Sequence, residues 1–293
     1  MALISVRDLN ITYTTDQGKI QAINSLSFDV QEGQVLGVVG ESGSGKTQTG
    51  LAILGLLPEN ATVSGRILFN GIDILALSQR EVRHWRSTQM AMIFQDPMDC
   101  LNPYLTIGSQ LCEVLIYHKG MNKKEACVQA LRMLERVKIN DAPRRIQQYP
   151  HEFSGGMRQR VMIAMALLCG PKLLIADEPT TALDVTVQRQ LIELLKELRR
   201  EFNMTLLFIS HDLGIVASLC HQIMVMKLGE KVEYGEREQV FFNPQHPYTQ
   251  KLLSSIPTLP PNTYHETSTS ISCLLYTSPS PRDRTRSRMP SSA

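Results

Sequence analysis

Short apolar runs and longer amphipathic stretches alternate along most of this 293-residue chain. In the first third, apolar positions form short segments bounded by turn-forming residues, which predicts strands at 4–13, 22–30, 34–40, 65–71 and 90–97. Apolar positions with helical spacing predict helices at 45–56, 79–87, 107–118, 122–137 and 154–169. The stretch from 98 to 169 is therefore expected to contain helices and no strand.

Two continuous apolar runs, 172–179 and 205–212, flank another helical pattern at 185–202. Apolar runs separated by helices are typical of parallel strands that are buried on both faces. We therefore predict an α/β core formed by residues 1–97 and 170–245, with an α-helical subdomain inserted at 98–169. An extension at 246–266 is expected to add one short helix.

The last 27 residues differ from the rest, because 19 of them are Ser, Thr, Pro or Arg. Such a composition cannot bury a core, and we expect residues 267–293 to be disordered. This segment resembles translated adapter or vector sequence, and a genuine disordered tail is the alternative. Four arginines and Asp283 give it a charge of +3 in a chain of net charge +2, so the rest carries −1. No nucleic-acid partner is expected from such a balance.

No membrane span or secretory signal is predicted. The longest apolar run, 161–169, is far shorter than the ~20 residues that a span requires. The first ten residues lack the basic and then apolar pattern of a secretory signal. The six cysteines form no C-x-x-C pair, so we expect reduced, buried thiols of a cytosolic protein and no metal or disulfide site.

The segment GESGSGKT, residues 40–47, fits the pattern G-x-x-x-x-G-K-[ST] between a predicted strand and a predicted helix. In that setting backbone N–H groups and a helix N-terminus face the phosphates of a nucleotide. Lys46 is expected to reach the β and γ phosphates, and Thr47 to offer its hydroxyl to Mg²⁺. A plain glycine-rich turn is the alternative, which the flanking elements disfavour.

Polar residues follow the ends of three apolar strands, at the sheet edge where parallel sheets bind ligands. Asp177 is expected to hold Mg²⁺, and Glu178 to polarise the water that attacks the γ-phosphate. His211 is expected to sense the γ-phosphate, and Gln95 to reach Mg²⁺ or the water and to connect the nucleotide with the helical insert. A capped strand end and an ordinary polar histidine are the structural alternatives.

Ser154, Gly155 and Gly156 begin the helix predicted at 154–169, although each glycine lowers helix stability by roughly 1 kcal/mol relative to alanine. A helix start with a Ser hydroxyl and uncrowded Gly amides is a second anion site. An N-cap with loose glycines is the alternative. Two phosphate sites beside one metal site make sense if the second binds a nucleotide held by another subunit.

Together and in this order, these motifs resemble the ATP-binding subunits of ABC transporters over residues 13–211. The resemblance implies a P-loop ATPase core with an N-terminal antiparallel β subdomain, ATP and Mg²⁺ as ligands, and Tyr13 stacked on the adenine. An ordinary strand aromatic is the alternative for Tyr13. The residues it implies for nucleotide binding are Tyr13, Gly40, Glu41, Ser42, Gly43, Ser44, Gly45, Lys46, Thr47, Gln48, Ser154, Gly155, Gly156, Asp177 and Asp184. Those it implies for catalysis are Lys46, Gln95, Glu178 and His211, and those for the metal are Thr47, Gln95 and Asp177.

Three stretches, 92–103, 149–188 and 246–257, are similar to the subunits of oligopeptide and dipeptide importers. This implies a peripheral protein on the cytoplasmic face of a bacterial inner membrane, paired head to tail with a sister ATPase as a heterodimer or a homodimer. The pair would drive two transmembrane permease subunits, supplied by a periplasmic or lipid-anchored solute-binding protein. Ser154 and Gly156 would grip the partner's γ-phosphate, and the insert after Gln95 would receive the permease subunits.

Some residues depart from the family pattern. Met157 stands where the general family has Gln, and Asp99 and Cys100 stand where small hydroxyl residues are more usual. Many relatives bind an iron–sulfur cluster through C-terminal cysteines, but Cys273 alone cannot hold one. The transported solute stays open, since importers of nickel, glutathione or antimicrobial peptides share much of the pattern.

Three other functions fit the sequence less well. A GTPase needs N-K-x-D after an apolar strand, and the nearest string, NKKE at 122–125, lies in a polar helical pattern. ABC factors that act on ribosomes or DNA carry two cassettes or long coiled-coil inserts, and neither is predicted in this sequence. A regulator without catalysis is disfavoured because Lys46, Asp177, Glu178 and His211 are all present.

Overall fold

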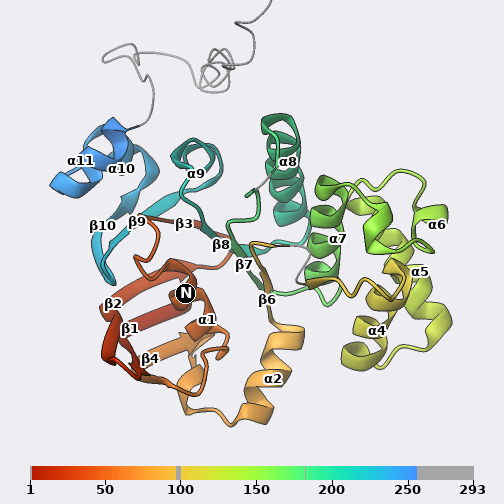
Figure 1. The fold of residues 1–293 in the computed structure, drawn as a ribbon, viewed down its shortest axis with the longest axis horizontal. Helices are drawn as coiled ribbons and strands as arrows, with labels where there is room; N and C mark the ends of the chain where they lie inside the picture. The colour runs from red at the N-terminus through yellow and green to blue at the C-terminus, as the bar shows by residue number, and fades with distance from the viewer. Residues whose placement is uncertain (1, 97–99, 182, 256–293) are drawn as a thin grey trace, which may run out of the picture. The chain divides into compact units, whose positions relative to one another are not determined.

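The computed structural model describes residues 2–96, 100–181 and 183–255, and its strands form two sheets (Figure 1). The first sheet is antiparallel, with the order β2-β1-β4-β5. Its strands are β1 (Ala2–Thr15), β2 (Gly18–Gln31), β4 (Ala61–Phe69) and β5 (Ile72–Asp73). The expected antiparallel β subdomain near the N-terminus is therefore confirmed.

The second sheet has the order β10-β9-β3-β8-β7-β6, and all its neighbouring strands are parallel except the edge pair β9–β10. Its strands are β3 (Val35–Val39), β6 (Met90–Ile93), β7 (Leu173–Asp177), β8 (Thr205–Ile209), β9 (Gln222–Lys227) and β10 (Glu230–Glu236). Every residue of β3, β7 and β8 is buried, which explains why these strands read as continuous apolar runs.

Alternate residues of the parallel sheet enter two different cores. Leu174, Leu206 and Phe208 belong to the core shared with the helical insert. Ile175 and Leu207 belong to the core beneath the antiparallel sheet. Apolar layers on both faces therefore fix the sheet in place, and the carboxyl ends of β3, β8 and β7 lie side by side at one edge.

Helices connect the strands of the second sheet. In Figure 1, α8 (Val185–Glu201) and α9 (Leu213–Leu219) are drawn above the second sheet, and α1 (Lys46–Ile53) is drawn below it. The helices between β6 and β7 are α4 (Ile107–Lys119), α5 (Lys123–Arg136), α6 (Ala142–Arg145) and α7 (Gly155–Leu167). The remaining helices are α2 (Gln79–Thr88), α10 (Arg237–Phe242) and α11 (Pro247–Ser254). Short 3₁₀ turns occupy Ile74–Ala76 and Pro150–Glu152.

Side-chain caps define where the helices of the insert begin. The hydroxyls of Thr106 and Ser154 accept the N–H groups of Ser109 and Met157. Asn122 forms a reciprocal capping box with Glu125 at the start of α5. These polar caps satisfy N–H groups that the helices themselves leave without acceptors.

The observed elements agree with the expected ones in type and differ at their ends. β4 begins at Ala61 instead of 65, and α1 ends at Ile53 instead of 56. The elements that were not predicted are β5, β9, β10, α6, α9 and α10. Within the described residues from 100 to 169 the regular elements are all helical, as expected. Some expectations concern residues outside the described ones, namely Pro97, Asp99, Ala182, Cys273 and the segment 267–293.

The described cysteines differ in exposure. Cys112 and Cys220 are buried, but Cys100 is exposed, so the expectation of buried thiols was wrong for Cys100.

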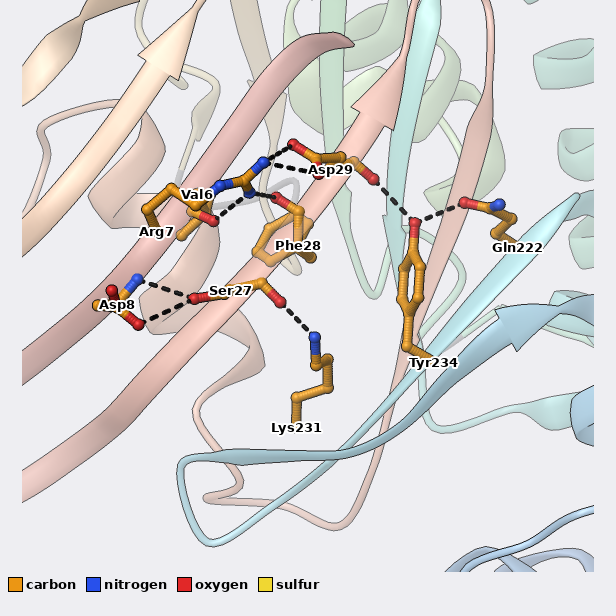
Figure 2. A network of polar contacts seen from close by, with 9 residues as sticks. All are labelled: Val6, Arg7, Asp8, Ser27, Phe28, Asp29, Gln222, Lys231 and Tyr234. Carbon is orange, nitrogen blue, oxygen red and sulfur yellow. Dashed lines mark hydrogen bonds and ion pairs between the residues drawn. The ribbon is translucent and has the colours of Figure 1, made fainter.

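A polar network ties the two sheets together (Figure 2). Nη2 of Arg7 in β1 donates to both carboxylate oxygens of Asp29 in β2, each at 2.8 Å. The Tyr234 hydroxyl of β10 lies 2.9 Å from the Asp29 carbonyl oxygen and 2.6 Å from Gln222 Oε1, and the Lys231 ammonium donates to the carbonyl oxygen of Ser27. The hairpin β9–β10 is thus held against β2, which places its turn close to the loop after β3.

Candidate nucleotide-binding and catalytic site

The loop between β3 and α1 has the conformation that its glycines permit. Gly45 has φ +96°, and a Cβ at this position would lie 2.5 Å from Ile23 Cδ1 and 2.8 Å from the carbonyl oxygen of Ala22. A side chain is therefore excluded both by the left-handed backbone and by the contact with β2. No side chain caps α1, so the backbone N–H groups of its first turn are not occupied by a capping residue. Such a helix start is suited to phosphate.

Lys46 lies inside this loop. Its side chain is only 6% exposed, and its ammonium donates to the carbonyl oxygens of Gly40 and Glu41, each at 2.8 Å. Burial lowers the pKa of Lys46, while the negative charges of Glu178 and Asp177 act in the opposite direction. Among the described residues, the ammonium has only neutral oxygens of Gly40, Glu41 and Ser44 as hydrogen-bond partners, so its charge is available to attract an anion.

The loop residues differ in exposure. Gly40, Ser44 and Gly45 are buried with Lys46, and Gln48 is half-buried. The exposed members of the loop are Glu41, Ser42, Gly43 and Thr47. The exposed part is where a ligand has access, and the buried part holds the loop to the protein.

Asp177, the last residue of β7, is 5% exposed, and its Oδ1 has no hydrogen-bond partner among the described residues. The pKa of Asp177 is raised, mainly by burial and further by the negative charge of Glu178. A hydrogen bond with Thr47 and the positive charge of Lys46 partly offset this shift. A buried oxygen without a partner is rare unless a ligand or ion satisfies it. Oxygen donors of a carboxylate and a hydroxyl suit Mg²⁺, so Asp177 and Thr47 fit the metal predicted here.

Glu178 is held on all sides by groups from neighbouring strand ends. Its Oε2 accepts hydrogen bonds from Gln95 Nε2 at 3.3 Å and Thr181 Oγ1 at 3.1 Å. Its Oε1 lies 3.1 Å from His211 Nδ1. Its own N–H donates to the carbonyl oxygen of Ile209 in β8 at 2.9 Å. The strand ends β6, β7 and β8 therefore bring Gln95, Glu178 and His211 together, as the sequence pattern indicated.

The backbone of Glu178 is left-handed, with φ +46°. A non-glycine residue in this region costs about 1–3 kcal/mol, and it persists where the surroundings fix it. The fixed neighbours are the hydrogen bond to β8 and the three groups around the carboxylate. This conformation turns the Glu178 side chain away from the path of β7, toward Gln95 and His211.

Tyr13 and Asp184 also have defined partners. The hydroxyl of half-buried Tyr13 donates to the side-chain oxygen of Gln48, so β1 contacts the first turn of α1. Asp184 caps α8, since its Oδ1 accepts the N–H groups of Thr186 and Val187 at 3.1 and 3.0 Å. Tyr13 is thus adjacent to the loop 40–47, which we name the phosphate loop after the ligand that its sequence predicts. Asp184 has a structural partner in its own helix.

Ser154, Gly155 and Gly156 lie at the start of α7, beside the loop that leads to α8. A Cβ at Gly155 would have Leu183 as its nearest neighbour, at 3.9 Å, and one at Gly156 would lie 2.5 Å from Val187 Cγ1. Among the described residues, no hydrogen bond or ion pair joins these three residues to Lys46, Asp177 or Glu178. The structure therefore brings the strand-edge residues together and leaves the group at 154–156 with a surface of its own, where Ser154 and Gly155 are exposed.

Two residues of the site were missed in the sequence. Thr181 holds the Glu178 carboxylate, and Tyr248 of α11 accepts the N–H of Glu41 at 3.1 Å. Thr181 lies three residues after Glu178, a spacing that a turn prediction could have used. Tyr248 is distant in sequence from the loop, and no local pattern indicates its contact.

Comparisons with known proteins identify the family. The model of the family described as ABC transporter matches residues 23–181, and that of the oligopeptide/dipeptide transporter, C-terminal region, matches residues 232–272. The oligopeptide transport ATP-binding protein OppD of Salmonella typhimurium is 56% identical over 257 residues, which are 88% of this chain and 77% of that protein. The chain belongs to the ABC transporter family. Its group is that of the oligopeptide and dipeptide ATP-binding proteins.

Other relatives agree. The dipeptide transport ATP-binding protein DppD of Bacillus subtilis is 50% identical over 88% of this chain and 77% of its own length. A dimeric structure of the ATP-binding cassette MJ0796, bound to ADP and Pi, has a TM-score of 0.71 and 26% identity over 80% of this chain and 98% of that chain. The predicted ABC ATPase fold and the ATPase class of the protein are thereby confirmed. Within the described residues no helix is both long enough and apolar enough to span a membrane.

Proposed function

We propose that this ATPase binds ATP at the edge formed by β3, β6, β7 and β8, and that its hydrolysis drives the import of oligopeptides or dipeptides. The observation that carries the proposal is the Glu178 carboxylate, held by Gln95 and His211 next to the unpartnered oxygen of Asp177. The carboxylate lies at the carboxyl edge of a parallel sheet, where such sheets bind ligands. This chain covers 77% of the oligopeptide transport protein OppD, and this similarity supports a peptide as the solute.

The geometry supports a binding role for each of the following residues. The loop from Gly40 to Gln48 would surround the phosphates with backbone N–H groups, and the Lys46 ammonium would exchange its carbonyl contacts for phosphate oxygens. Tyr13, fixed beside α1 by Gln48, would carry the adenine. Thr47 and Asp177 would hold Mg²⁺, and Gln95 would reach it from the end of β6. Bound Mg²⁺ neutralises the charge that develops on the phosphate oxygens.

Glu178 would accept the proton of the attacking water. Its side chain is 19% exposed and its carboxylate is oriented by its neighbours, so its position before the reaction is already defined. A positioned base contributes typically 10²–10⁴-fold to a rate. His211, which is 66% exposed, lies where the γ-phosphate and Glu178 can both reach it.

The assembly belongs to the proposal as well. Ser154, Gly155 and Gly156 would bind the γ-phosphate held by a second ATPase subunit, either a sister chain or a second copy of this chain, with Asp184 at the same boundary. The exposed positions of Ser154 and Gly155 support this role. The dimeric MJ0796 cassette is a solved example of pairing in the family. Two permease subunits would contact the insert 98–169, at the cytoplasmic face of the inner membrane, and a periplasmic or lipid-anchored binding protein would supply the solute.

The test replaces Glu178 with glutamine, which keeps the size of the side chain and removes its ability to accept a proton. We expect Glu178→Gln to bind ATP as the unchanged protein does and to lose at least about 100-fold in turnover. ATP binding and phosphate release are measured together, with exposed Glu193→Gln as the control that should keep both. Normal turnover in Glu178→Gln would show that another group is the base.

Import is tested by fractionation. We expect the chain to be recovered with membranes only when permease subunits are expressed with it, and peptide uptake to depend on Glu178. Recovery with ribosomes or DNA would contradict the proposed role in import.

A further inference from the structure

The last described helix contacts the phosphate loop directly. α11 begins with His246, Pro247 and Tyr248, and the hydroxyl of Tyr248 accepts the N–H of Glu41 at 3.1 Å. Tyr248 is 7% exposed and belongs to the core that α11 shares with the parallel sheet. A residue of the C-terminal family region therefore touches the second residue of the loop at 40–47.

Several contacts fix Tyr248 in this position. His246 caps α11, because its Nδ1 accepts the N–H of Tyr248 at 3.1 Å. The Glu233 carboxylate of β10 accepts the N–H groups of Gln245 and His246 at 2.8 and 3.2 Å. The ammonium of Lys227, at the end of β9, lies 5.0 Å from the centre of the Tyr248 ring. The tyrosine is thus anchored to the hairpin β9–β10, which is itself tied to the antiparallel sheet (Figure 2).

The peptide groups of Glu41 are held from both sides. Tyr248 accepts its N–H, while its carbonyl oxygen accepts the Lys46 ammonium at 2.8 Å. The same ammonium donates to the carbonyl oxygen of Gly40, and Gly229 in the β9–β10 turn donates to the carbonyl oxygen of Ser44 at 3.1 Å. A change in the position of Glu41 would therefore also change the position of Lys46.

We propose that Tyr248 is a positioning residue for nucleotide binding, and that through it the C-terminal family region sets the affinity of the phosphate loop. This inference rests on the proposed function of the loop. The Tyr248 hydroxyl is proposed to contact the loop and not the nucleotide itself. It fixes the start of the loop before the nucleotide arrives, so that less freedom is lost on binding. Its loss acts on affinity and leaves the reaction of bound ATP unchanged.

The test compares two tyrosines of the same region. Tyr248→Phe keeps the buried ring and removes the hydroxyl that Glu41 uses. Tyr234→Phe removes a hydroxyl whose partners are Asp29 and Gln222, away from the loop. The pairing of β9 with β3 still holds the hairpin beside the loop in this variant, so it is the matched control. Tyr248→Phe is expected to raise the Kd for MgADP and the KM for ATP by about 3- to 10-fold, as the loss of one hydrogen bond does, with kcat within about 2-fold of the unchanged protein. Tyr234→Phe is expected to change neither constant, although both variants lower the unfolding temperature.

Hydrogen exchange of the amides at 40–47 in nucleotide-free protein provides a second measurement. We expect faster exchange at Glu41 in Tyr248→Phe than in Tyr234→Phe. Equal exchange, or equal Kd values in the two variants, would overturn the inference while the proposed function stands. An unchanged protein that neither binds nor hydrolyses ATP would overturn the proposed function, and the exchange rates would still decide whether Tyr248 fixes the loop.

Discussion

His221 joins the start of β9 to β3 by a reciprocal pair of hydrogen bonds. Its Nδ1 accepts the N–H of Val35 at 3.0 Å, and its own N–H donates to the carbonyl oxygen of Val35 at 2.9 Å. Although His221 as a whole is exposed, partial desolvation of its ring lowers its pKa, the charges of Arg199 and Arg237 lower it further, and Glu236 raises it. The neutral ring is therefore the form that the fold accommodates, and a proton on Nδ1 would remove the acceptor for Val35.

This residue predicts a pH-dependent stability. Because the pKa is lower in the folded chain than its ordinary value of about 6.5, the unfolded chain binds more protons as the pH falls. Above the ordinary pKa of about 6.5, neutral His221 contributes fully to the free energy of unfolding. This contribution is lost as the pH falls from about 6.5 through the folded pKa. Urea unfolding from about pH 8 to about pH 5.5 should show this loss, and His221→Asn should reduce it, since the amide oxygen can accept the same N–H without titrating. Exposed His118→Asn serves as the control, and an equal pH dependence in both variants would contradict the assignment.

At the residue scale, spacing predicted the chemistry better than the conformation. The pattern around Lys46 and the carboxylates after β7 were sufficient to place Gly45, Asp177 and Glu178 at one edge, because strand ends of a parallel sheet share that edge. The left-handed backbone of Glu178 was not predictable, since glutamate has no preference for it and the surrounding contacts impose it. The role of Tyr248 depends on tertiary structure alone.

At the scale of elements, α7 shows two reasons for adjacent glycines. The sequence indicated open amides for an anion at both positions. In the structure Gly156 lies directly against α8, with Val187 Cγ1 at 2.5 Å from where a Cβ would be, whereas the nearest atom to a Cβ at Gly155 is 3.9 Å away. Close helix packing therefore requires glycine at 156, independently of any ligand, and leaves room for a side chain at 155.

Gly156→Ala should consequently destabilise the protein, by about 1–3 kcal/mol, as overpacked positions do. Val187→Ala, added as a second change, removes the methyl groups that the new Cβ meets and should recover most of that loss. Gly155→Ala is the matched control and should leave stability unchanged or slightly raised, because alanine favours a helix. Free energies of unfolding in urea measure all three. Destabilisation of equal size at 155 and 156 would show that α8 is not the cause.

Most elements that were not predicted have weak patterns of their own. β9 is the exception, since its residues 223–226 form a buried apolar run that was overlooked. β10 is an edge strand with exposed Glu230 and Lys231 at its start, so its apolar alternation is incomplete. α9 has only seven residues, and its position between β8 and β9 becomes clear only once both strands are known. β4 begins in the polar stretch from Ala61 because it pairs with β1 there, at Tyr13 and Thr12. Long, continuous apolar runs such as β7 and β8 were predictable because a strand that is buried on both faces has apolar residues at nearly every position.

At the scale of the whole molecule, the hairpin β9–β10 connects three regions. It contacts β2 through Tyr234 and Lys231, the phosphate loop through Gly229, and α11 through Glu233. Its contacts with β2 and with the phosphate loop join segments that are far apart in the sequence, whereas Glu233 and His246 are 13 residues apart. The phosphate loop is thus fixed by segments from both ends of the described chain, which is consistent with a site whose geometry must be set before the nucleotide binds.

The helical insert carries Ser154 and Gly155 on its exposed start of α7, without a described contact to Lys46 or Glu178 in the same chain. If each site takes its loop from one molecule and its α7 start from another, variants of the two halves should complement each other. Lys46→Ala and Ser154→Arg are each expected to lose nearly all turnover. Mixed in equal amounts they should recover about one quarter of the normal rate, because half of randomly formed pairs are mixed and each mixed pair has one intact site of two. The recovered rate should fall on dilution. A mixture as inactive as its components would instead assign the second half of the site to a different chain, and full activity of either variant alone would contradict a shared site.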